Sequence, residues 1–335
     1  MSPQGQPSKS LRATLYDADG RDRQVELRSR ITDGLGEHQL LWVDVDGRDA
    51  EALEQLRTTF DLPDETTRVL ASDRTVAQLL RYPERVHLRL VAMEPDESSE
   101  ESDLRAADAS PISIDIIVTQ NVVITSHQGT TSAFDHFLGQ VRGDSELGAL
   151  NAADFLTILV DSVLAGYLEL VEAIGRRIDA LDEVALRASQ SQAFLQEVVL
   201  LRRRVATLRR ALAPHRWAFA PLARPDFELE GLGKPWLGIV DRLEQTVESV
   251  ENARELLIGT FDVYMASSAQ RTNEVMKALT ILSAILLPSV VIAGVMGMNF
   301  NMEFFDDTGN FWLAIGSMFG LSVIVLGFSR WRGWI

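Results

Sequence analysis

Two long apolar stretches constrain the fold of this chain more than any other feature. Residues 278–298 and 311–329 contain no charged side chain. As helices, stretches of about 20 residues cross roughly 30 Å of hydrocarbon. Pro288 interrupts the first stretch, and the carbonyl that it leaves unbonded is tolerated where neighbouring helices or a wet pore can bond it. The pattern therefore predicts two membrane spans, and a buried hairpin of a soluble domain is the weaker alternative.

Charges around the two stretches indicate their orientation. The outer flanks carry basic residues: Arg271, Lys277, Arg330 and Arg332. The connector between the stretches carries acidic residues and no Lys or Arg: Glu303, Asp306 and Asp307. Because basic residues favour the cytoplasmic side, we expect an extracytoplasmic connector and both termini in the cytoplasm, in a multi-pass protein of the inner or plasma membrane.

Composition narrows the classes of partner. The chain has 48 acidic and 32 basic residues, a net charge of −16 and no cysteine. This acidic surplus would repel phosphate and argues against nucleic acid, while it either enriches cations at the surface or simply keeps a large oligomer soluble. The lack of cysteine excludes disulfides and thiolate metal sites. Since no cleavable apolar leader is evident, we expect the residues before the first span in the cytosol.

The first 130 residues predict a cytosolic mixed α/β domain. Helices are expected at 49–60 and 64–80, and the polar, acidic residues 95–103 predict a solvated loop. Short alternating or β-branched segments predict strands at 11–16, 24–27, 39–45, 86–91, 113–118 and 121–125.

Residues 131–234 predict a helical cytosolic segment. One long helix is expected from about residue 152 and a second over 192–212, which Pro214 and the prolines after it should end. The arginines at 202–204 and 209–210 predict a solvated helix face that pairs with acidic neighbours, although binding of anions or lipid is an alternative.

A third helix is expected to start after Pro235 and to continue into the membrane. Its apolar residues recur at steps of three, four or seven, so residues 235–276 predict a stalk and 277–298 the first span. A connector at 299–310, a second span at 311–329 and a basic cytosolic tail at 330–335 complete the chain. A rod of about 64 residues, on the order of 95 Å, cannot be buried by one such chain, and two spans cannot enclose an aqueous path. The pattern therefore predicts self-association around an axis.

Several short motifs resemble the CorA-type divalent-cation channels. Gly297-Met298-Asn299 closes a first span that contains Leu287-Pro288, and the similarity covers most of the chain. It also includes residues 42–47, 262–265, 272–277 and 292–294. The resemblance implies an α+β cytosolic domain, a very long stalk helix and two C-terminal transmembrane helices in a funnel-shaped homopentamer. The first span would line the pore and the second would lie outside it.

The same resemblance implies a selectivity filter of Gly297, Met298 and Asn299. A ring of neutral Asn299 amides suits contact with a hydrated Mg²⁺ ion, which holds its waters tightly, whereas a carboxylate ring would release the ion more slowly. A role for Asn299 in ending the helix is compatible with this.

One face of the first span predicts a pore lining. Residues at steps of three or four share that face: Asn273, Met276, Thr280, Ser283, Leu287, Val290 and Gly294. In the resembled family, apolar rings matching Met276, Leu279 and Leu287 form a gate that could close by dewetting, and Asp262 would form an acidic ring at the cytosolic exit. Ordinary helix packing is an equal alternative for any single residue. Gly316 and Gly320 in the second span predict a close helix contact.

The function that the resemblance implies is passive uptake of divalent cations, driven by the membrane potential. Mg²⁺ is the expected substrate, with Co²⁺ or Ni²⁺ as further substrates, and Mg²⁺ would also act as a regulatory ligand between subunits. Gly238 stands where some members carry an Asp of that regulatory site, and Asp241 and Glu244 lie nearby, so the regulatory ligands are left unassigned. No covalent cofactor is expected, and the sequence has no motif of an enzyme such as a phosphate-binding loop.

Two alternatives stay open. A ZntB-like Zn²⁺ transporter would share the fold and the tripeptide, although the five histidines have no zinc-site spacing. A membrane-anchored scaffold would bind partners through its cytosolic domain and would transport nothing.

Overall fold

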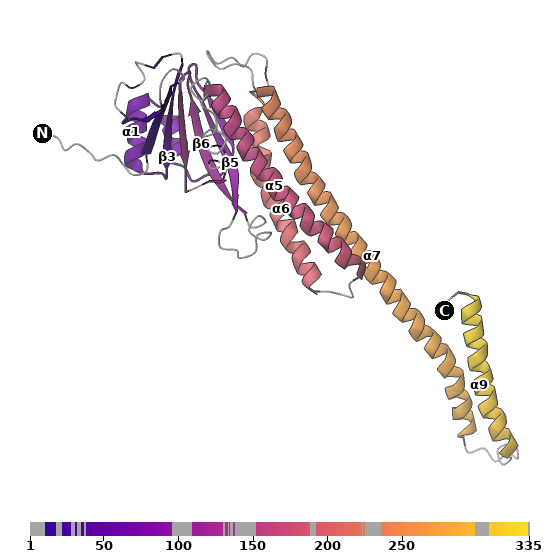
Figure 1. Cartoon of the computed structure of the whole chain (residues 1–335). Coiled ribbons are helices and arrows are strands. Elements are labelled where there is room, and N and C mark those ends of the chain that lie inside the picture. The colour runs from indigo at the N-terminus through magenta and orange to yellow at the C-terminus, as the bar shows by residue number, and fades with distance from the viewer. Residues whose placement is uncertain are drawn as a thin grey trace. The chain divides into compact units, whose positions relative to one another are not determined.

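The computed structural model divides the chain into two compact units (Figure 1). Unit 1 comprises Met1–Glu183 and Gln192–Thr260, and unit 2 comprises Val184–Ser191 and Phe261–Ile335. The structure describes residues 11–17, 22–27, 31, 35–36, 38–95, 109–129, 131–132, 134, 137, 152–187, 192–222, 224, 236–298 and 308–333. The predicted loop after residue 95 lies outside these residues.

A seven-stranded sheet forms the centre of unit 1. Its strands stand in the order β2-β1-β3-β7-β6-β5-β4, and only β3 and β7 pair in parallel. The bounds are β1 Leu11–Asp17, β2 Arg23–Gln24, β3 Gln39–Asp46, β4 Gln78–Arg81, β5 Val86–Pro95, β6 Ala109–Val118 and β7 Val122–His127. The predicted α/β domain is confirmed, although the strand expected at 24–27 is only the two-residue β2.

Helices α1 (Ala50–Phe60) and α2 (Asp64–Leu70) cover one face of this sheet. The backbone N–H of Glu51 donates to the side chain of Asp49, which caps the start of α1. Leu41, Val43 and Val45 alternate along β3 and pack against this helical layer. This core closes one side of the sheet within the chain itself.

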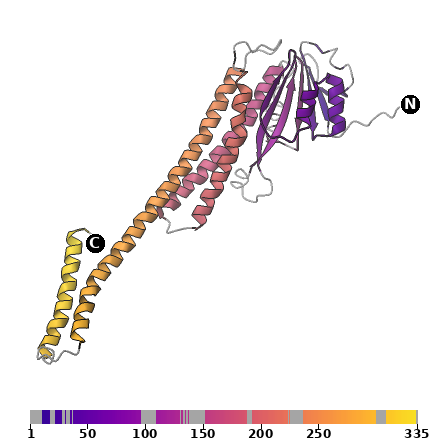
Figure 2. The same cartoon turned by 180° about the vertical axis from the view of Figure 1, so that it is seen from behind.

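Aromatic side chains fill the opposite face. Trp42 alternates with the residues that face α1, and its ring centroid lies 5.3 Å from that of Phe155 and 5.8 Å from that of Phe137. Phe155 belongs to α5 (Ala152–Arg187), which is followed by α6 (Gln192–Phe219). The Trp42 indole N–H donates to the Thr125 hydroxyl at 2.9 Å, so the buried polar atom is satisfied. Unit 1 therefore has helices on both faces of its sheet (Figures 1 and 2).

The edge strand β4 is short, so the edge of β5 away from β6 has no strand partner beyond Arg89. Side chains of α5 and α6 bond the backbone there instead. Pairing with β4 ends opposite Arg89. At Val91, the backbone N–H donates to Nε2 of His215 at 3.1 Å, and the carbonyl accepts from the Tyr167 hydroxyl at 2.9 Å. Burial lowers the pKa of His215 to about 4, so the ring is neutral and its Nδ1–H donates to the Leu212 carbonyl. Two helices thereby complete the hydrogen bonding of one sheet residue.

A buried ionic cluster joins the neighbouring strands β5 and β6. Asp115 accepts from Arg89 Nη2 at 2.7 Å and from His87 Nε2 at 2.8 Å. Burial alone would raise the pKa of the Asp115 carboxyl, but the hydrogen bonds from His87 and Arg89 outweigh burial and hold the pKa below its ordinary value. The cluster satisfies both charges without water.

The helix predicted at 64–80 is wrong in its second half. Helix α2 ends at Leu70, and residues 78–81 form β4. Arg89 explains the ending, since its guanidinium donates to the carbonyls of Val69 and Arg74. Carbonyls bonded by a side chain from the sheet need no further helical turn, so the chain is free to reach the sheet edge.

The break predicted at Pro214 is also wrong. Helix α6 continues through Pro214 to Phe219 and ends before Pro221, while Pro225 lies outside the described residues. Buried residues on both sides of the proline, Leu212 and His215, hold this turn on the sheet and offset the lost hydrogen bond.

Ion pairs link the long helices of unit 1. Helix α7 (Trp236–Met296) begins directly after Pro235, as predicted. The pairs across the bundle are Arg177–Glu197, Arg209–Glu251, Arg216–Glu244 and Arg242–Asp161. For Arg209, the prediction of a solvated arginine that pairs with an acidic neighbour is confirmed, whereas for Arg204 the predicted solvated face is wrong, because this side chain is buried. Because the groups of the four pairs are partly exposed, each pair adds little stability.

Unit 2 contains the end of α7 and helix α9 (Thr308–Trp331). Both views show α9 antiparallel to this part of α7 (Figures 1 and 2). Both helices are long and apolar enough to cross a membrane. Helix α7 covers the predicted first span of 277–298 up to Met296, two residues short of its predicted end, and α9 extends the predicted 311–329 by a few residues at each end.

Candidate functional site: one face of helix α7

The apolar part of α7 stays helical through Pro288. Proline cannot donate to the carbonyl of Ala284, one turn earlier. The next residue, Ser289, donates its hydroxyl to the Ile285 carbonyl at 3.3 Å. The span is therefore a continuous helix on which positions can be compared by helical geometry.

All the side chains predicted to line a pore are exposed along α7. Met276, Leu287 and Val290 have exposed fractions of 55%, 65% and 67%. At about 100° per residue, the predicted stripe occupies a window of roughly 100° around the helix, and Asp262 falls on the same side. Leu279 flanks the window. The remaining exposed members are Asn273, Thr280, Ser283 and Gly294.

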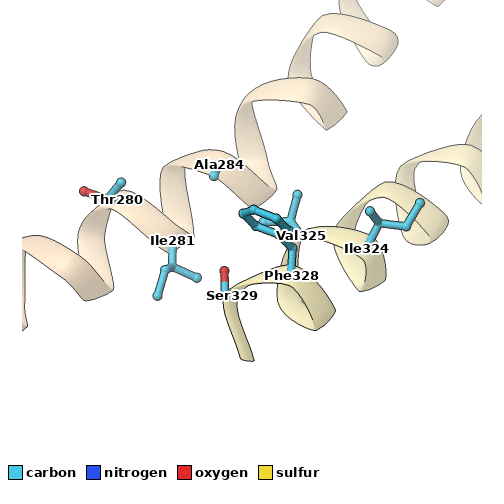
Figure 3. Close-up of a pocket in the computed structure, with 7 residues that line it drawn as sticks. All are labelled: Thr280, Ile281, Ala284, Ile324, Val325, Phe328 and Ser329. Atoms are coloured by element: carbon cyan, nitrogen blue, oxygen red, sulfur yellow. The ribbon is translucent and has the colours of Figure 1, made fainter. Parts of the chain in front are cut away.

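A different face of the same helix is less exposed. Its residues are Ile281, Ile285, Pro288, Ser289, Ile292 and Met296, all half-buried. This second face lies roughly opposite the stripe. Ile281 lines a groove together with residues of α9 (Figure 3). Within unit 2, α7 therefore turns one face to α9 and leaves the predicted stripe, apart from Thr280, without a partner among the described residues.

The groove has a volume of about 350 Å³. Its lining comes from Thr280, Ile281 and Ala284 of α7 and from Ile324, Val325, Phe328 and Ser329 of α9 (Figure 3). Thr280, which the sequence predicts as a pore hydroxyl, stands at the edge between the stripe and the groove. Its hydroxyl donates to the Met276 carbonyl at 2.8 Å, which leaves its oxygen lone pairs to accept from water.

The carboxyl end of α7 leaves little room for a side chain at the first residue of the tripeptide. The Gly297 N–H donates to the Ala293 carbonyl at 2.8 Å, and the Met298 N–H donates to the Val295 carbonyl at 3.2 Å, a tighter last turn. A Cβ on Gly297 would lie 3.3 Å from the Ala293 oxygen, closer than ordinary contact. Asn299 and the connector acids Glu303, Asp306 and Asp307 lie outside the described residues.

The structure also describes Gly238 and Glu244, which the sequence relates to regulation, and the two glycines of α9. A Cβ at Gly238, Gly316 or Gly320 would meet open space, so the close contact predicted at the two α9 glycines is not made with any described residue. Glu244 binds Arg216, with its shortest contact at 2.5 Å. Among the described residues no group of three His, Asp or Glu side chains forms a metal site.

The second face of α7 and the groove were not predicted. Ile281, Ile285, Pro288 and Ile292 repeat at steps of three or four, as the stripe does, and this spacing is the signal that could have shown a second packing face.

An α/β domain, a long helix that continues into the membrane and a second C-terminal span define a class of two-span membrane protein. Comparison with known proteins gives the family. Residues 37–328 match the model of the family described as CorA-like Mg²⁺ transporter protein, so the chain belongs to that family.

Individual relatives agree with this assignment. The cobalt/magnesium transport protein CorA of Thermotoga maritima is 30% identical over 230 residues, which cover 66% of this chain and 64% of that protein. The zinc transport protein ZntB of Yersinia enterocolitica is 24% identical over 236 residues, covering 67% of this chain and 68% of that protein. The structure titled as the complete CorA magnesium transporter from Methanocaldococcus jannaschii matches with a TM-score of 0.76 and 15% identity, covering 98% of this chain and all of that one. This last similarity shows the shared fold.

Proposed function

We propose that the chain conducts divalent cations, Mg²⁺ first, through a pore that α7 helices from five copies line. The observation that supports this proposal is the exposed stripe of α7, which runs along the membrane-spanning segment and, apart from Thr280 at its edge, lies on the side away from the α9 groove. Names of relatives that include magnesium, cobalt and zinc transport support the cation class. Co²⁺ and Ni²⁺ are further candidate substrates.

The chemistry of the stripe suits a pore better than contact with lipid. Leu287 and Val290 are apolar, but Asn273, Thr280 and Ser283 add an amide and two hydroxyls on the same side of the helix. Polar groups at membrane depth are stable where they face a water-filled cavity or other protein. With α9 on the opposite side, α7 would be the inner helix of the assembly and α9 the outer one.

In this proposal Asn299 provides the filter. Mg²⁺ dehydrates reluctantly and keeps an octahedral shell of water, which a ring of neutral amide oxygens can contact without removing it. Gly297 supports the ring by permitting the tight last turn of α7. A neutral ring releases the ion more readily than a carboxylate ring, as conduction requires.

The membrane potential would supply the driving force. Moving a divalent ion down 100 mV releases roughly 4.6 kcal/mol, twice the value for one charge. The exposed apolar residues Met276, Leu279 and Leu287 would form the gate. Binding of cytosolic Mg²⁺ between acidic faces of neighbouring subunits would favour the closed arrangement, because the ion neutralises their repulsion.

Flux into proteoliposomes tests the proposal. The full chain is reconstituted with an internal magnesium dye, at set membrane potential and pH. We expect Mg²⁺ influx that increases with an inside-negative potential and that Asn299→Ala reduces. Ser322→Ala, which removes a polar side chain whose hydroxyl is bonded inside α9, serves as the matched control with unchanged flux. Influx that ignores the potential or survives Asn299→Ala would overturn the channel, and no influx of any cation would favour the scaffold.

Zinc transport is the second candidate, and the similarity to the Yersinia zinc transport protein favours testing it. The same vesicles are loaded with a zinc dye and assayed with and without a pH gradient. Zn²⁺ influx without Mg²⁺ influx would replace the magnesium proposal while keeping the fold and the filter.

A further inference from the structure

The groove between α7 and α9 is open to an apolar guest. Its lining is apolar except for the hydroxyls of Thr280 and Ser329, and its volume is about 350 Å³. Thr280 already donates its hydroxyl to the Met276 carbonyl. An empty space of this size costs the lining residues their dispersion contacts, and inside a bilayer the nearest molecules able to restore them are acyl chains.

Two cations lie at one end of this groove. The Arg332 guanidinium carbon lies 5.9 Å from the ring centroid of Phe328, which forms part of the groove wall. Lys277 precedes Ile281 by about one helical turn, on the same side of α7. Both side chains are exposed. Arg330 lies roughly on the opposite side of α9, at about 100° per residue.

Acidic side chains do not cancel this charge. Residues 275–298 of α7 and 308–333 of α9 contain no Asp or Glu. The nearest acid on α7, Glu274, lies three residues before Lys277 and accepts from the Gln270 amide at 3.4 Å, so its single negative charge stands against the two positive charges of Lys277 and Arg332. The end of the groove therefore carries net positive charge next to an apolar hollow.

We infer that this groove binds an anionic phospholipid of the cytoplasmic leaflet, with an acyl chain between α7 and α9 and the headgroup phosphate at Lys277 and Arg332. The apolar hollow matches the chain, and the cations match the phosphate. The side of the membrane agrees as well, since basic flanks mark the cytoplasmic face, where anionic lipids attract Lys and Arg. The inference requires membrane insertion only and is independent of transport.

Native mass spectrometry of the full chain in detergent measures the headgroup preference. The protein is titrated with phosphatidylglycerol and with phosphatidylcholine of identical acyl chains. We expect tighter binding of phosphatidylglycerol, and a loss of about fivefold in its affinity for each of Lys277→Gln and Arg332→Gln. Arg68→Gln removes one exposed cation from α2 and should leave the affinity unchanged. Glycerol phosphate, which has no acyl chain, should not compete.

A second pair of variants tests the hollow itself. Ala284→Trp fills the groove and should reduce binding of both lipids several-fold, whereas Val323→Trp, on an exposed side of α9, should not. Circular dichroism confirms that each variant keeps its helices, and the surface Gln variants test the site even if Ala284→Trp does not fold. Equal binding of the two lipids would overturn the inference. So would an Ala284→Trp variant that alters the subunit number but not lipid binding, because another copy would then occupy the groove.

Discussion

The two units of this chain differ in the side chains that they bury and expose. Unit 1 buries Asp115 and Arg89 and pairs them within the chain. In unit 2, large apolar side chains are exposed instead, as at Val290 with 67% and Phe319 with 75%. Unit 1 has the pattern of a domain folded in water, while unit 2 exposes the apolar surface expected of a membrane segment.

Because of this difference, we expect substitutions in the two units to change different measured quantities. Changes in the buried network of unit 1 should alter the free energy of unfolding, because the lost partner is inside the chain. Changes in the exposed stripe of α7 should alter flux with little effect on the fold of a single chain. Variants in each unit test this expectation.

The largest effect is expected from Asp115→Ala. The variant leaves the Arg89 guanidinium buried without its carboxylate, which costs roughly 3–5 kcal/mol of stability. Urea unfolding of the full chain in detergent, followed by circular dichroism, measures the change.

Asp73→Ala is the matched control. Asp73 also pairs with an arginine, Arg48, but its side chain is 91% exposed. We expect a change of less than about 1 kcal/mol. Equal costs for the two variants would mean that burial does not distinguish the two ion pairs.

A smaller effect should follow pH through His215. Its pKa is about 4 in the folded chain, against 6.5 for the ordinary group. The unfolded chain therefore binds a proton between these pH values that the folded chain does not. The contribution of the neutral His215 to the free energy of unfolding, about 3 kcal/mol in total, is fully present above pH 6.5 and is lost as pH falls toward 4.

The His215→Gln variant identifies the source of this pH dependence. Glutamine offers an acceptor oxygen to the Val91 N–H but does not titrate, so the slope of stability between pH 6.5 and 4 should decrease. Two other groups set the limits of the test. His127 has a raised pKa despite burial, because Asp44 bonds it, and its contribution is present below pH 6.5 and lost as pH rises through its folded pKa. Asp115 has a pKa below its ordinary value of 3.8, so its contribution to stability is lost only as pH falls below 3.8. An unchanged slope would show that His215 is not the group responsible.

In unit 2, Leu287→Ser should raise cation flux several-fold, because a hydroxyl makes an apolar constriction easier to hydrate. Val323→Ser on α9 is the control, with an original side chain of similar exposure, 56% against 65%. Dye-reported influx in proteoliposomes gives both values. Equal gains for both variants would place the gate elsewhere.

Features that depend on neighbouring residues in the chain were predictable. The stripe of α7 follows from local periodicity, and the start of α7 follows from Pro235. The family motifs then gave the stripe a candidate role. The position of the two spans in the membrane was equally predictable from the sequence, because it depends on the length of the apolar stretches and on the charges beside them.

Features that depend on distant residues were not predictable. Helix α2 ends early because Arg89, some twenty residues later, bonds the carbonyl of Val69 in its last turn. His215 accepts from Val91, 124 residues away in the chain, and nothing in its sequence neighbourhood marks it for that role. The groove likewise needs residues from two helices, so only their packing reveals it.

The smallest expected effect comes from the same substitution made in each unit. In α5 of unit 1, a Cβ at Gly175 meets open space, so Gly175→Ala should stabilise the fold by about 0.5–1 kcal/mol through its higher helix propensity. At the end of α7, a Cβ at Gly297 would lie 3.3 Å from the Ala293 oxygen, so Gly297→Ala must shift the last turn beside Asn299. That variant should lower flux without a measurable change in the unfolding of unit 1. If Gly297→Ala conducts normally, the tight turn is not needed for the filter, and the requirement for glycine at that position must come from contacts between copies.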